Sequence, residues 1–172
     1  SEDYTPSTIE ALDTALGAAV HDLLEHDLVK PLGQWLDDEL VLVCAPQHPL
    51  GGRNLLPVAE ISQLTYVLRE RESSMRITLD RTLADIGIAG IPIAMEVGST
   101  DTIVEMLERG RHVSFLPRFA VQGAIDQGEL HHVRIEGLRI MRTLWIARTR
   151  ANLDNPVAEA LIRLIRERPP GG

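Results

Sequence analysis

Residues 35–50 read WLDDELVLVCAPQHPL, and this stretch contains the clearest strand in the sequence. Its central part, residues 39–44, is a continuous run rich in Val and Leu, which is typical of a strand buried on both faces of a sheet. Pro46 and the glycine pair at 51–52 then interrupt the apolar pattern, and these residue types favour a loop. The stretch therefore predicts a buried strand that ends in a loop.

On both sides of this strand, short apolar runs alternate with stretches of helical periodicity. In those stretches apolar residues recur at spacings of three and four, and Gly87 and Gly110 supply C-terminal stops. The alternation of strands and helices indicates an α/β fold with a largely parallel sheet. Further strands are predicted at residues 14–20, 64–68, 91–97, 112–116, 130–135 and 138–146, and helices at residues 74–86, 100–110, 118–125 and from 156 onward.

The composition excludes several classes of protein. The 172 residues are 44% hydrophobic and 24% charged, an ordinary balance for one or two globular domains. The net charge of -8 argues against direct binding to nucleic-acid phosphates, because DNA-binding domains present a basic face. No apolar run reaches the roughly 18–20 residues of a membrane span. The N-terminus does not resemble a secretory signal, and a single cysteine cannot form an intrachain disulfide. We therefore expect a cytoplasmic protein with no membrane partner.

Two predicted helices begin directly after strands, and both starts carry hydroxyl side chains. Ser73 and Ser74 stand at one start, and Ser99 and Thr100 stand at the other. In open α/β sheets, ligands bind at the carboxyl ends of strands, near helix N-termini whose backbone N–H groups are unpaired. This arrangement favours a small anion such as a carboxylate. The alternative is that the hydroxyl groups only cap the helices, and the sequence leaves both roles open.

Three arginines lie close to the first serine pair. Arg69, Arg71 and Arg76 could pair with an anionic ligand. The alternative is a charged surface in which they pair with the neighbouring Glu70 and Glu72, and such surface pairs are common and weak.

The histidines and the cysteine do not form a metal-binding or catalytic motif. His21 and His26 are five positions apart, a spacing that does not place both on one helical face, so a solvated loop is favoured over a metal site. His131 and His132 are adjacent on a predicted strand and therefore point to opposite faces. Cys44 lies in an apolar run, which favours a buried and inert thiol. No phosphate-binding loop or paired-carboxylate motif is present, so we expect no cofactor, no metal and no enzyme activity.

Four segments resemble, in the same order, the regulatory domain of LysR-type transcriptional regulators. Together they cover residues 12–168, and the match in order and spacing is more specific than any single segment. The four are LDTALGAA at 12–19, WLDDELVLVCAPQHPL at 35–50, LRERESSMR at 68–76 and VGSTDTIVEMLERGRHVSFLP at 97–117.

The resemblance implies a fold like that of periplasmic binding proteins, with two α/β subdomains joined by crossing strands and a ligand between them. Subdomain I would combine residues 1–19 and 147–172 and would be incomplete, and subdomain II would span residues 20–146. The family carries an N-terminal helix-turn-helix domain that this sequence lacks, so we expect contact with DNA only through that domain. A homodimer or tetramer is the expected assembly.

The expected ligand is a small anionic or zwitterionic effector. A solute-binding protein of a transporter is the main alternative, because it would share the fold and the fold alone does not decide function. The expected effector-binding residues are Ser73, Ser74, Ser99, Thr100, His21 and Arg76.

Overall fold

The computed structural model describes residues 29–149 and 154–167 of the chain. Within these residues no helix is long and apolar enough to cross a membrane. The elements, in chain order, are the strands and helices β1 (Val29–Cys44), β2 (Leu55–Leu56), the 3-10 helix η1 (Val58–Gln63), β3 (Tyr66–Arg69), α3 (Ser74–Asp85), β4 (Ile93–Val97), α4 (Thr100–Leu107), β5 (Val113–Pro117), α5 (Arg118–Asp126), β6 (His131–Ile135), β7 (Ile140–Thr149) and α6 (Pro156–Glu167).

The chain divides into two compact units, and the boundaries between them fall inside β1 and β7. One unit comprises residues 39–141, and the other combines residues 1–38 with residues 142–172. Each of these two strands therefore contributes residues to both units. The subdomain bounds that the resemblance implied, at residues 19 and 146, stay a prediction.

The unit of residues 39–141 is built on a mixed sheet in the order β2-β6-β1-β5-β3-β4, and β7 pairs with β1 off this path. The strand β3 is parallel to β4 and β5, and β2 is parallel to β6. In contrast, β1 is antiparallel to β5 and β6. The expected parallel sheet is thus right for β5-β3-β4 and wrong for β1. The continuous apolar run of β1 predicts that the strand is buried, but it does not fix the direction in which the strand runs relative to its neighbours.

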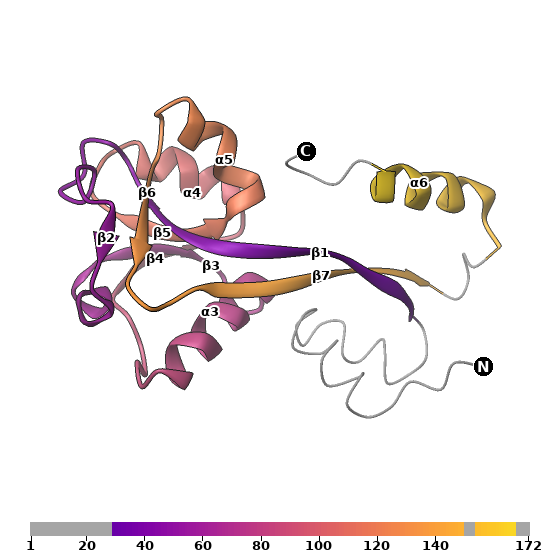
Figure 1. The fold of residues 1–172 in the computed structure, drawn as a ribbon, viewed down its shortest axis with the longest axis horizontal. Helices are drawn as coiled ribbons and strands as arrows, with labels where there is room; N and C mark the ends of the chain where they lie inside the picture. The colour runs from indigo at the N-terminus through magenta and orange to yellow at the C-terminus, as the bar shows by residue number, and fades with distance from the viewer. Residues whose placement is uncertain (1–28, 150–153, 168–172) are drawn as a thin grey trace. The chain divides into compact units, whose positions relative to one another are not determined.

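Helices cover both faces of this sheet (Figure 1). In that view α4 and α5 lie above the strands, and α3 lies below them. The helix α3 connects the parallel neighbours β3 and β4, so these three elements form the strand-helix-strand unit expected from the alternating pattern.

The core of this unit lies between the sheet and its helices. The rings of Tyr66 and Phe115 are at most 1% exposed and stack with their centroids 5.7 Å apart. The Tyr66 hydroxyl donates a hydrogen bond to the carbonyl oxygen of Ile61 at 3.0 Å, so this buried polar group is satisfied. Every residue of β5 is buried, which confirms the interpretation of its continuous apolar run as an interior strand.

The helices begin and end close to the residues predicted from the sequence. Gly87 and Gly110 follow α3 and α4 with φ angles of 83° and 73°, the left-handed conformation that glycine adopts without a steric cost. The side chain of Asn155 accepts a hydrogen bond from the backbone N–H of Val157 at 2.9 Å, so it caps α6, which begins at Pro156 as expected. The sequence did not predict β2 or η1, and the strand predicted at residues 14–20 lies outside the described residues.

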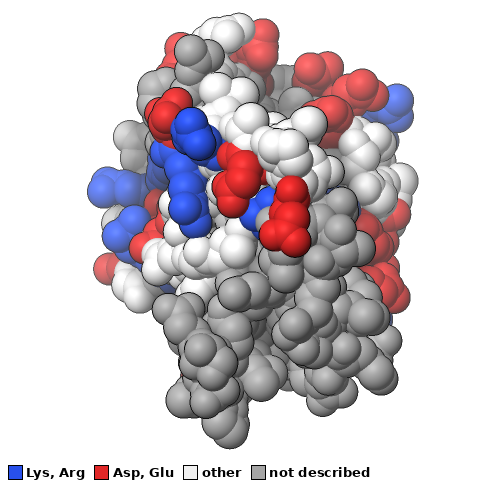
Figure 2. Space-filling view, turned by 90° about the vertical axis from the view of Figure 1, so that its right-hand side faces the viewer, with Lys and Arg blue, Asp and Glu red and all other residues white. Residues whose placement is uncertain are grey.

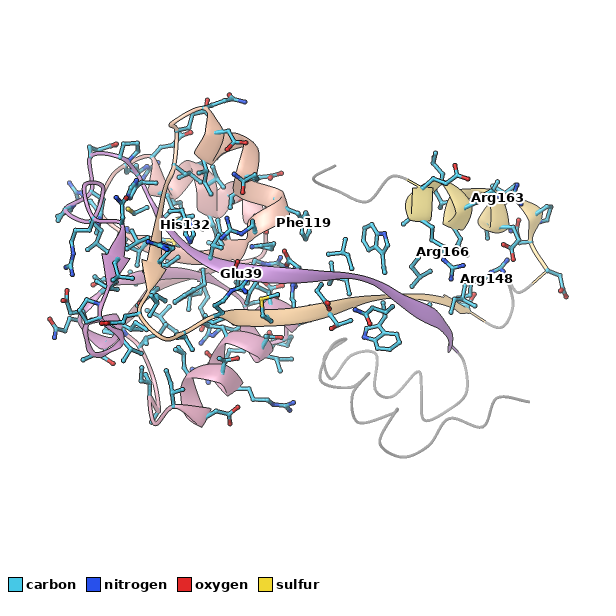
Figure 3. The ribbon with its side chains drawn as sticks, viewed as in Figure 1. Glu39, Phe119, His132, Arg148, Arg163 and Arg166 are labelled. Atoms are coloured by element: carbon cyan, nitrogen blue, oxygen red, sulfur yellow. The ribbon has the colours of Figure 1, made fainter. Side chains whose placement is uncertain are left out.

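The described part of the other unit contains β1 up to Asp38, β7 from Arg142, and α6. Asp38 and Arg142 form an ion pair at 2.8 Å, with side chains that are 2% and 9% exposed. Figure 3 labels Arg148 of β7, whose guanidinium donates to Glu159 of α6 at 2.9 Å. These contacts tie β1 to β7 and β7 to α6.

Candidate ligand-binding site

The two serine-bearing helix starts lie at the same edge of the sheet. The helix α3 begins shortly after β3, α4 begins shortly after β4, and β3 and β4 are parallel neighbours. The carboxyl ends of both strands, with the N-termini of both helices, therefore point to one edge. This is the edge at which open α/β sheets bind ligands, and it carries the four hydroxyl residues singled out in the sequence.

At the start of α3 the hydroxyl groups are not used for capping. Ser73 is the N-cap residue with extended backbone, but its side chain makes no capping hydrogen bond. Among the described residues, neither Ser73 nor Ser74 uses its hydroxyl in a hydrogen bond. The first intrahelical bond is donated by Ile77 to Ser73, so the N–H groups of the first turn have no partner within the helix. This helix start therefore offers both hydroxyl groups and backbone donors to a ligand.

At the start of α4 the capping alternative is partly supported. The Ser99 hydroxyl accepts a hydrogen bond from the backbone N–H of Thr102 at 3.4 Å, which is longer than the roughly 2.7–3.2 Å of most N–H···O hydrogen bonds. Asp101 places a negative charge in the first turn, which suits the helix dipole but would repel an anion. The Thr100 hydroxyl makes no hydrogen bond to another described residue. The helix α4 is thus the less favourable half of an anion site.

Arg76 lies beside these helix starts, but its guanidinium is engaged by other groups. The side chain is 5% exposed. Its Nε donates to the Asp80 carboxylate at 2.9 and 3.0 Å, and its Nη1 donates to Glu96 at 3.0 Å and to the carbonyl oxygen of Arg69 at 3.1 Å. These contacts join α3 to the ends of β3 and β4. Arg76 is therefore a positioning residue in this structure, and its expected contact with an effector stays a prediction.

The other two arginines near the serines are paired with glutamates. Arg69 donates two hydrogen bonds of 2.8 Å to Glu70, and these hydrogen bonds lower the pKa of Glu70 to about 2. Arg71 is 77% exposed and lies 3.6 Å from Glu96. The contact of Arg69 matches the charged-surface alternative, which paired it with Glu70. Arg71 also has a carboxylate partner, but that partner is Glu96 and not Glu70 or Glu72.

The remaining candidates play structural parts or lie elsewhere. His21 lies outside the described residues. His131 has its Nε2 2.8 Å from the carbonyl oxygen of Arg53. Cys44 is fully buried, and burial raises the pKa of its thiol to about 11, which leaves the thiol protonated and unreactive. In the part of the chain that the structure describes, no group of three or more His, Cys, Asp or Glu residues could hold a metal ion.

The sequence did not indicate a hollow that opens beside β1. Glu39, Arg118 and Arg139 meet there. Arg118 and Arg139 lie 79 and 100 positions from Glu39 along the chain, so no local pattern could reveal the cluster.

Charges of both signs are interspersed on the molecular surface. On the face drawn in Figure 2, basic and acidic side chains lie next to one another. This mixed face fits the net charge of -8 and differs from the basic face of a DNA-binding domain.

Curated relatives of this chain are transcriptional regulators. The chain is 33% identical over 111 residues to the "uncharacterized HTH-type transcriptional regulator YeiE" of Escherichia coli, a match that covers 64% of this chain and 37% of the relative. It is 29% identical over 127 residues to the "HTH-type transcriptional regulator CbbR" of Xanthobacter flavus, covering 73% of this chain and 38% of the relative. The chain thus spans about two fifths of the length of these relatives.

Solved structures with the same fold are regulatory domains. The regulatory domain of CcmR from Synechocystis, in complex with 2-PG, matches with a TM-score of 0.70 at 16% identity, covering 88% of this chain and 79% of that one. The effector-binding domain of QuiR, in complex with shikimate, matches with a TM-score of 0.67 at 18% identity, covering 81% and 65%.

The family model described as "LysR substrate binding domain" matches residues 12–170, which is nearly the whole chain. This chain therefore belongs to the LysR substrate-binding domain family, the regulatory domain of LysR-type transcriptional regulators, and is not an enzyme.

Proposed function

We propose that this domain senses a small anionic or zwitterionic metabolite at the edge of the sheet where α3 and α4 begin. The observation that carries the proposal is the start of α3, where the hydroxyl groups of Ser73 and Ser74 and the first-turn N–H groups have no partner among the described residues. Such groups bind carboxylates and other small anions well. The ligands of two structural neighbours, 2-PG and shikimate, support the choice of a small effector, and shikimate carries a carboxylate.

The domain would control transcription through a part of the protein outside this chain. The curated relatives are HTH-type regulators more than twice as long as the matched region, and we propose that DNA is contacted through such a helix-turn-helix domain. Effector binding would act by favouring one of two conformations of the full protein, because a ligand shifts an equilibrium only by its differential affinity. A regulator that acts on DNA belongs in the cytoplasm. The alternative of a transporter's solute-binding protein is set aside, because the family is the regulatory one.

We also propose that the domain self-associates, as a homodimer or tetramer, through β4. This strand ends the sheet order, and Met95 on it is 45% exposed. Unpaired edge strands with apolar side chains favour pairing with another chain. Sedimentation velocity over a range of concentrations should show a dimer that Met95→Lys weakens. A chain that stays monomeric at every concentration would contradict this part of the proposal.

A ligand panel with serine variants tests the proposed sensing site. The thermal midpoint of the chain is measured with small organic acids and amino acids. A ligand at about 100 times its Kd stabilises the fold by about 2.7 kcal/mol. Ser74→Ala should abolish the shift, and Ser62→Ala, an exposed serine of η1, serves as the matched control.

The same variants separate capping from ligand binding. Because the Ser99 hydroxyl caps α4, Ser99→Ala should lower the ligand-free stability by about 1 kcal/mol, whereas Ser74→Ala should leave it nearly unchanged. Each ligand shift is therefore measured from the midpoint of the same variant without ligand. A ligand shift that survives in both variants would place the effector elsewhere and overturn the proposal.

A further inference from the structure

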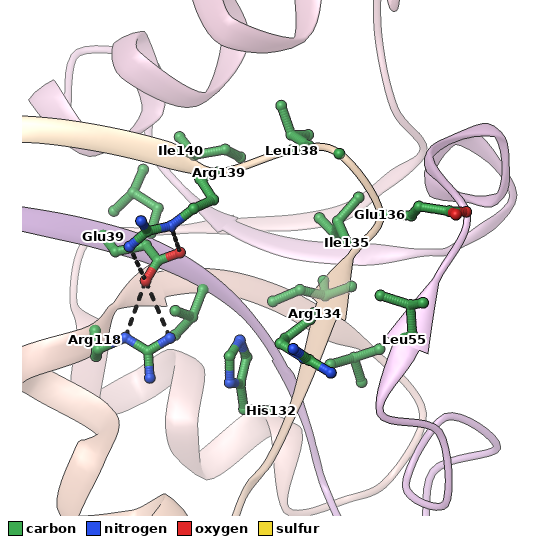
Figure 4. A pocket seen from close by; sticks show the side chains of 15 residues that line it. Glu39, Leu55, Arg118, His132, Arg134, Ile135, Glu136, Leu138, Arg139 and Ile140 are labelled. Atoms are coloured by element: carbon green, nitrogen blue, oxygen red, sulfur yellow. Dashed lines mark hydrogen bonds and ion pairs between the residues drawn. The ribbon is translucent and has the colours of Figure 1, made fainter.

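A hollow of about 470 Å³ opens beside β1, on the side where β6 leaves it (Figure 4). The strand β6 pairs with β1 only at residues 131–133 and then pairs with β2 through Arg134 and Ile135. The first residues of β1 in this unit, Glu39 to Val41, therefore face an opening that the turn between β6 and β7 closes on its far side. In the sheet order, β5 separates this opening from β3 and β4, so it shares no residue with the site proposed above.

The charged end of the hollow is built around Glu39. The carboxylate is 16% exposed. Arg118 donates from Nε and Nη2 to its Oε2 at 3.1 Å each, and Arg139 donates to both of its oxygens at 3.1 and 3.3 Å. Burial by itself raises the pKa of Glu39, but hydrogen bonds and charge from Arg139 and Arg118 lower it overall. One carboxylate is thus shared by two guanidinium groups.

Two further groups face the hollow, and neither side chain is hydrogen-bonded to a residue within the described part of the chain. Arg134 is exposed, and its guanidinium is not hydrogen-bonded to any described residue. His132 lies on β6 near Glu39 (Figure 3), and burial together with the charge of Arg118 lowers its pKa, so its imidazole is neutral near pH 7. In Figure 4 the remaining charged group, Glu136, points away from the arginines.

The charge of the lining contrasts with the charge of the chain. Three arginines and two glutamates leave the lining with a net charge of +1, counting His132 as neutral, whereas the chain as a whole carries -8. A hollow that concentrates positive charge in an acidic protein attracts anions.

Apolar side chains also line the hollow, and Leu55 lies opposite Arg134 in the pairing of β2 with β6. Leu55 is 46% exposed to solvent and is one of the lining residues. A pocket with an apolar wall and a few convergent polar groups is the usual form of a small-molecule site. The apolar side chains of the lining that reach solvent are Leu55, Ile135 and Leu138, whereas Val133 and Ile140 are 1% exposed and belong to the core.

We propose that this hollow is a second ligand site, which binds a small organic acid with its carboxylate toward Arg134 and Arg139 and its apolar body against Leu55. The carboxylate of Glu39 already accepts hydrogen bonds from Arg139, so it competes with the ligand for that guanidinium group. The proposal does not depend on the serine site, because the two sites use different residues and different strands.

Ligand-observed NMR with phenylacetate as the probe, on the full 172-residue chain, tests the site. Phenylacetate should bind with a Kd of about 1 mM or tighter, and phenylacetamide, which lacks the charge, should bind at least roughly fivefold more weakly because a charged hydrogen bond is lost. Arg134→Gln should weaken phenylacetate binding by a similar factor. Arg109→Gln removes the same charge from an exposed residue outside the hollow and should leave the affinity unchanged.

The decisive variant is Glu39→Gln, for which the proposal expects tighter binding of phenylacetate. A merely structural ion pair would give the opposite result, because losing the carboxylate loosens the cationic end. Equal affinity in Arg134→Gln and Arg109→Gln, or no detectable binding to the unmodified chain, would overturn the proposal. Loss of binding in Ser74→Ala with no effect of Arg134→Gln would assign the probe to the serine site and also overturn it.

Discussion

Replacing Arg76 should destabilise the domain far more than replacing its exposed neighbour Arg71. The Arg76 guanidinium is 5% exposed and serves three acceptors, the carboxylates of Asp80 and Glu96 and the carbonyl oxygen of Arg69. Hydrogen bonds to charged groups contribute about 1.5–3 kcal/mol and neutral ones about 1 kcal/mol. Asp80 and Glu96 are 50% and 37% exposed, so water compensates part of the loss. We therefore expect Arg76→Gln to lower the free energy of unfolding by about 3 kcal/mol.

Urea unfolding followed by circular dichroism measures this difference directly. For a chain of this size, a loss of about 3 kcal/mol corresponds to a drop of about 6–12 °C in the thermal midpoint. The control, Arg71→Gln, removes a side chain that is 77% exposed and makes one contact of 3.6 Å to the same Glu96. Exposed pairs contribute little, so this variant should unfold with the parent chain. If the two variants lose stability equally, the assignment of Arg76 as a positioning residue is wrong.

Two further predictions concern the loop after β1 and the acid stability of the domain. A Cβ atom at Gly51 would lie 1.8 Å from the backbone oxygen of Pro46, whereas one at Gly52 would meet nothing within 4 Å. Gly51→Ala should therefore lower the free energy of unfolding by about 1–3 kcal/mol, and Gly52→Ala serves as the control. If the two variants unfold at the same urea concentration, the close approach of Pro46 to Gly51 does not limit the side chain there. The pKa of Glu39 is lowered from 4.5 in the folded chain, so the unfolded chain binds the proton more readily. The ion pairs of Glu39 therefore stabilise the fold above pH 4.5, and this stabilisation is lost as the pH falls through the folded pKa. The stability gap between the parent chain and Glu39→Gln should accordingly close below pH 4.5, and a gap that stays constant in acid would exclude the ion pair as its source.

The strands and helices of residues 39–141 followed largely from the sequence, because their apolar periodicity and their glycine stops act locally. The helix α3 begins at Ser74, as predicted. Two elements could not be seen in this way. The two-residue strand β2 is too short to show an alternating pattern, and β1 extends back to Val29 through a stretch that includes Pro31, Gly33 and Asp37, residue types that are depleted in strands. Their strand conformation depends on pairing with distant segments rather than on local pattern.

In the candidate site, too, the features with a local sequence pattern could be predicted, and the contacts between distant residues could not. The four hydroxyl residues were identified because helix starts after strands have a local signature. The engagement of Arg76 was missed, because Glu96 lies 20 positions away in the sequence and only the parallel pairing of β3 with β4 brings it near. The cluster of Glu39 with Arg118 and Arg139 is more distant still along the chain, and it depends on where β6 turns away from β1.

The burial of Cys44 makes this domain a convenient background for site-specific labelling. It is the sole cysteine of the sequence, it is fully buried, and its thiol has a pKa of about 11, so a maleimide reagent meets almost no thiolate in the folded state. A fluorophore or spin label attached to a cysteine newly placed on the surface would therefore report from one chosen position without removal of the native thiol. The distance between two such labels would report whether the conformation of the chain changes when an effector is added.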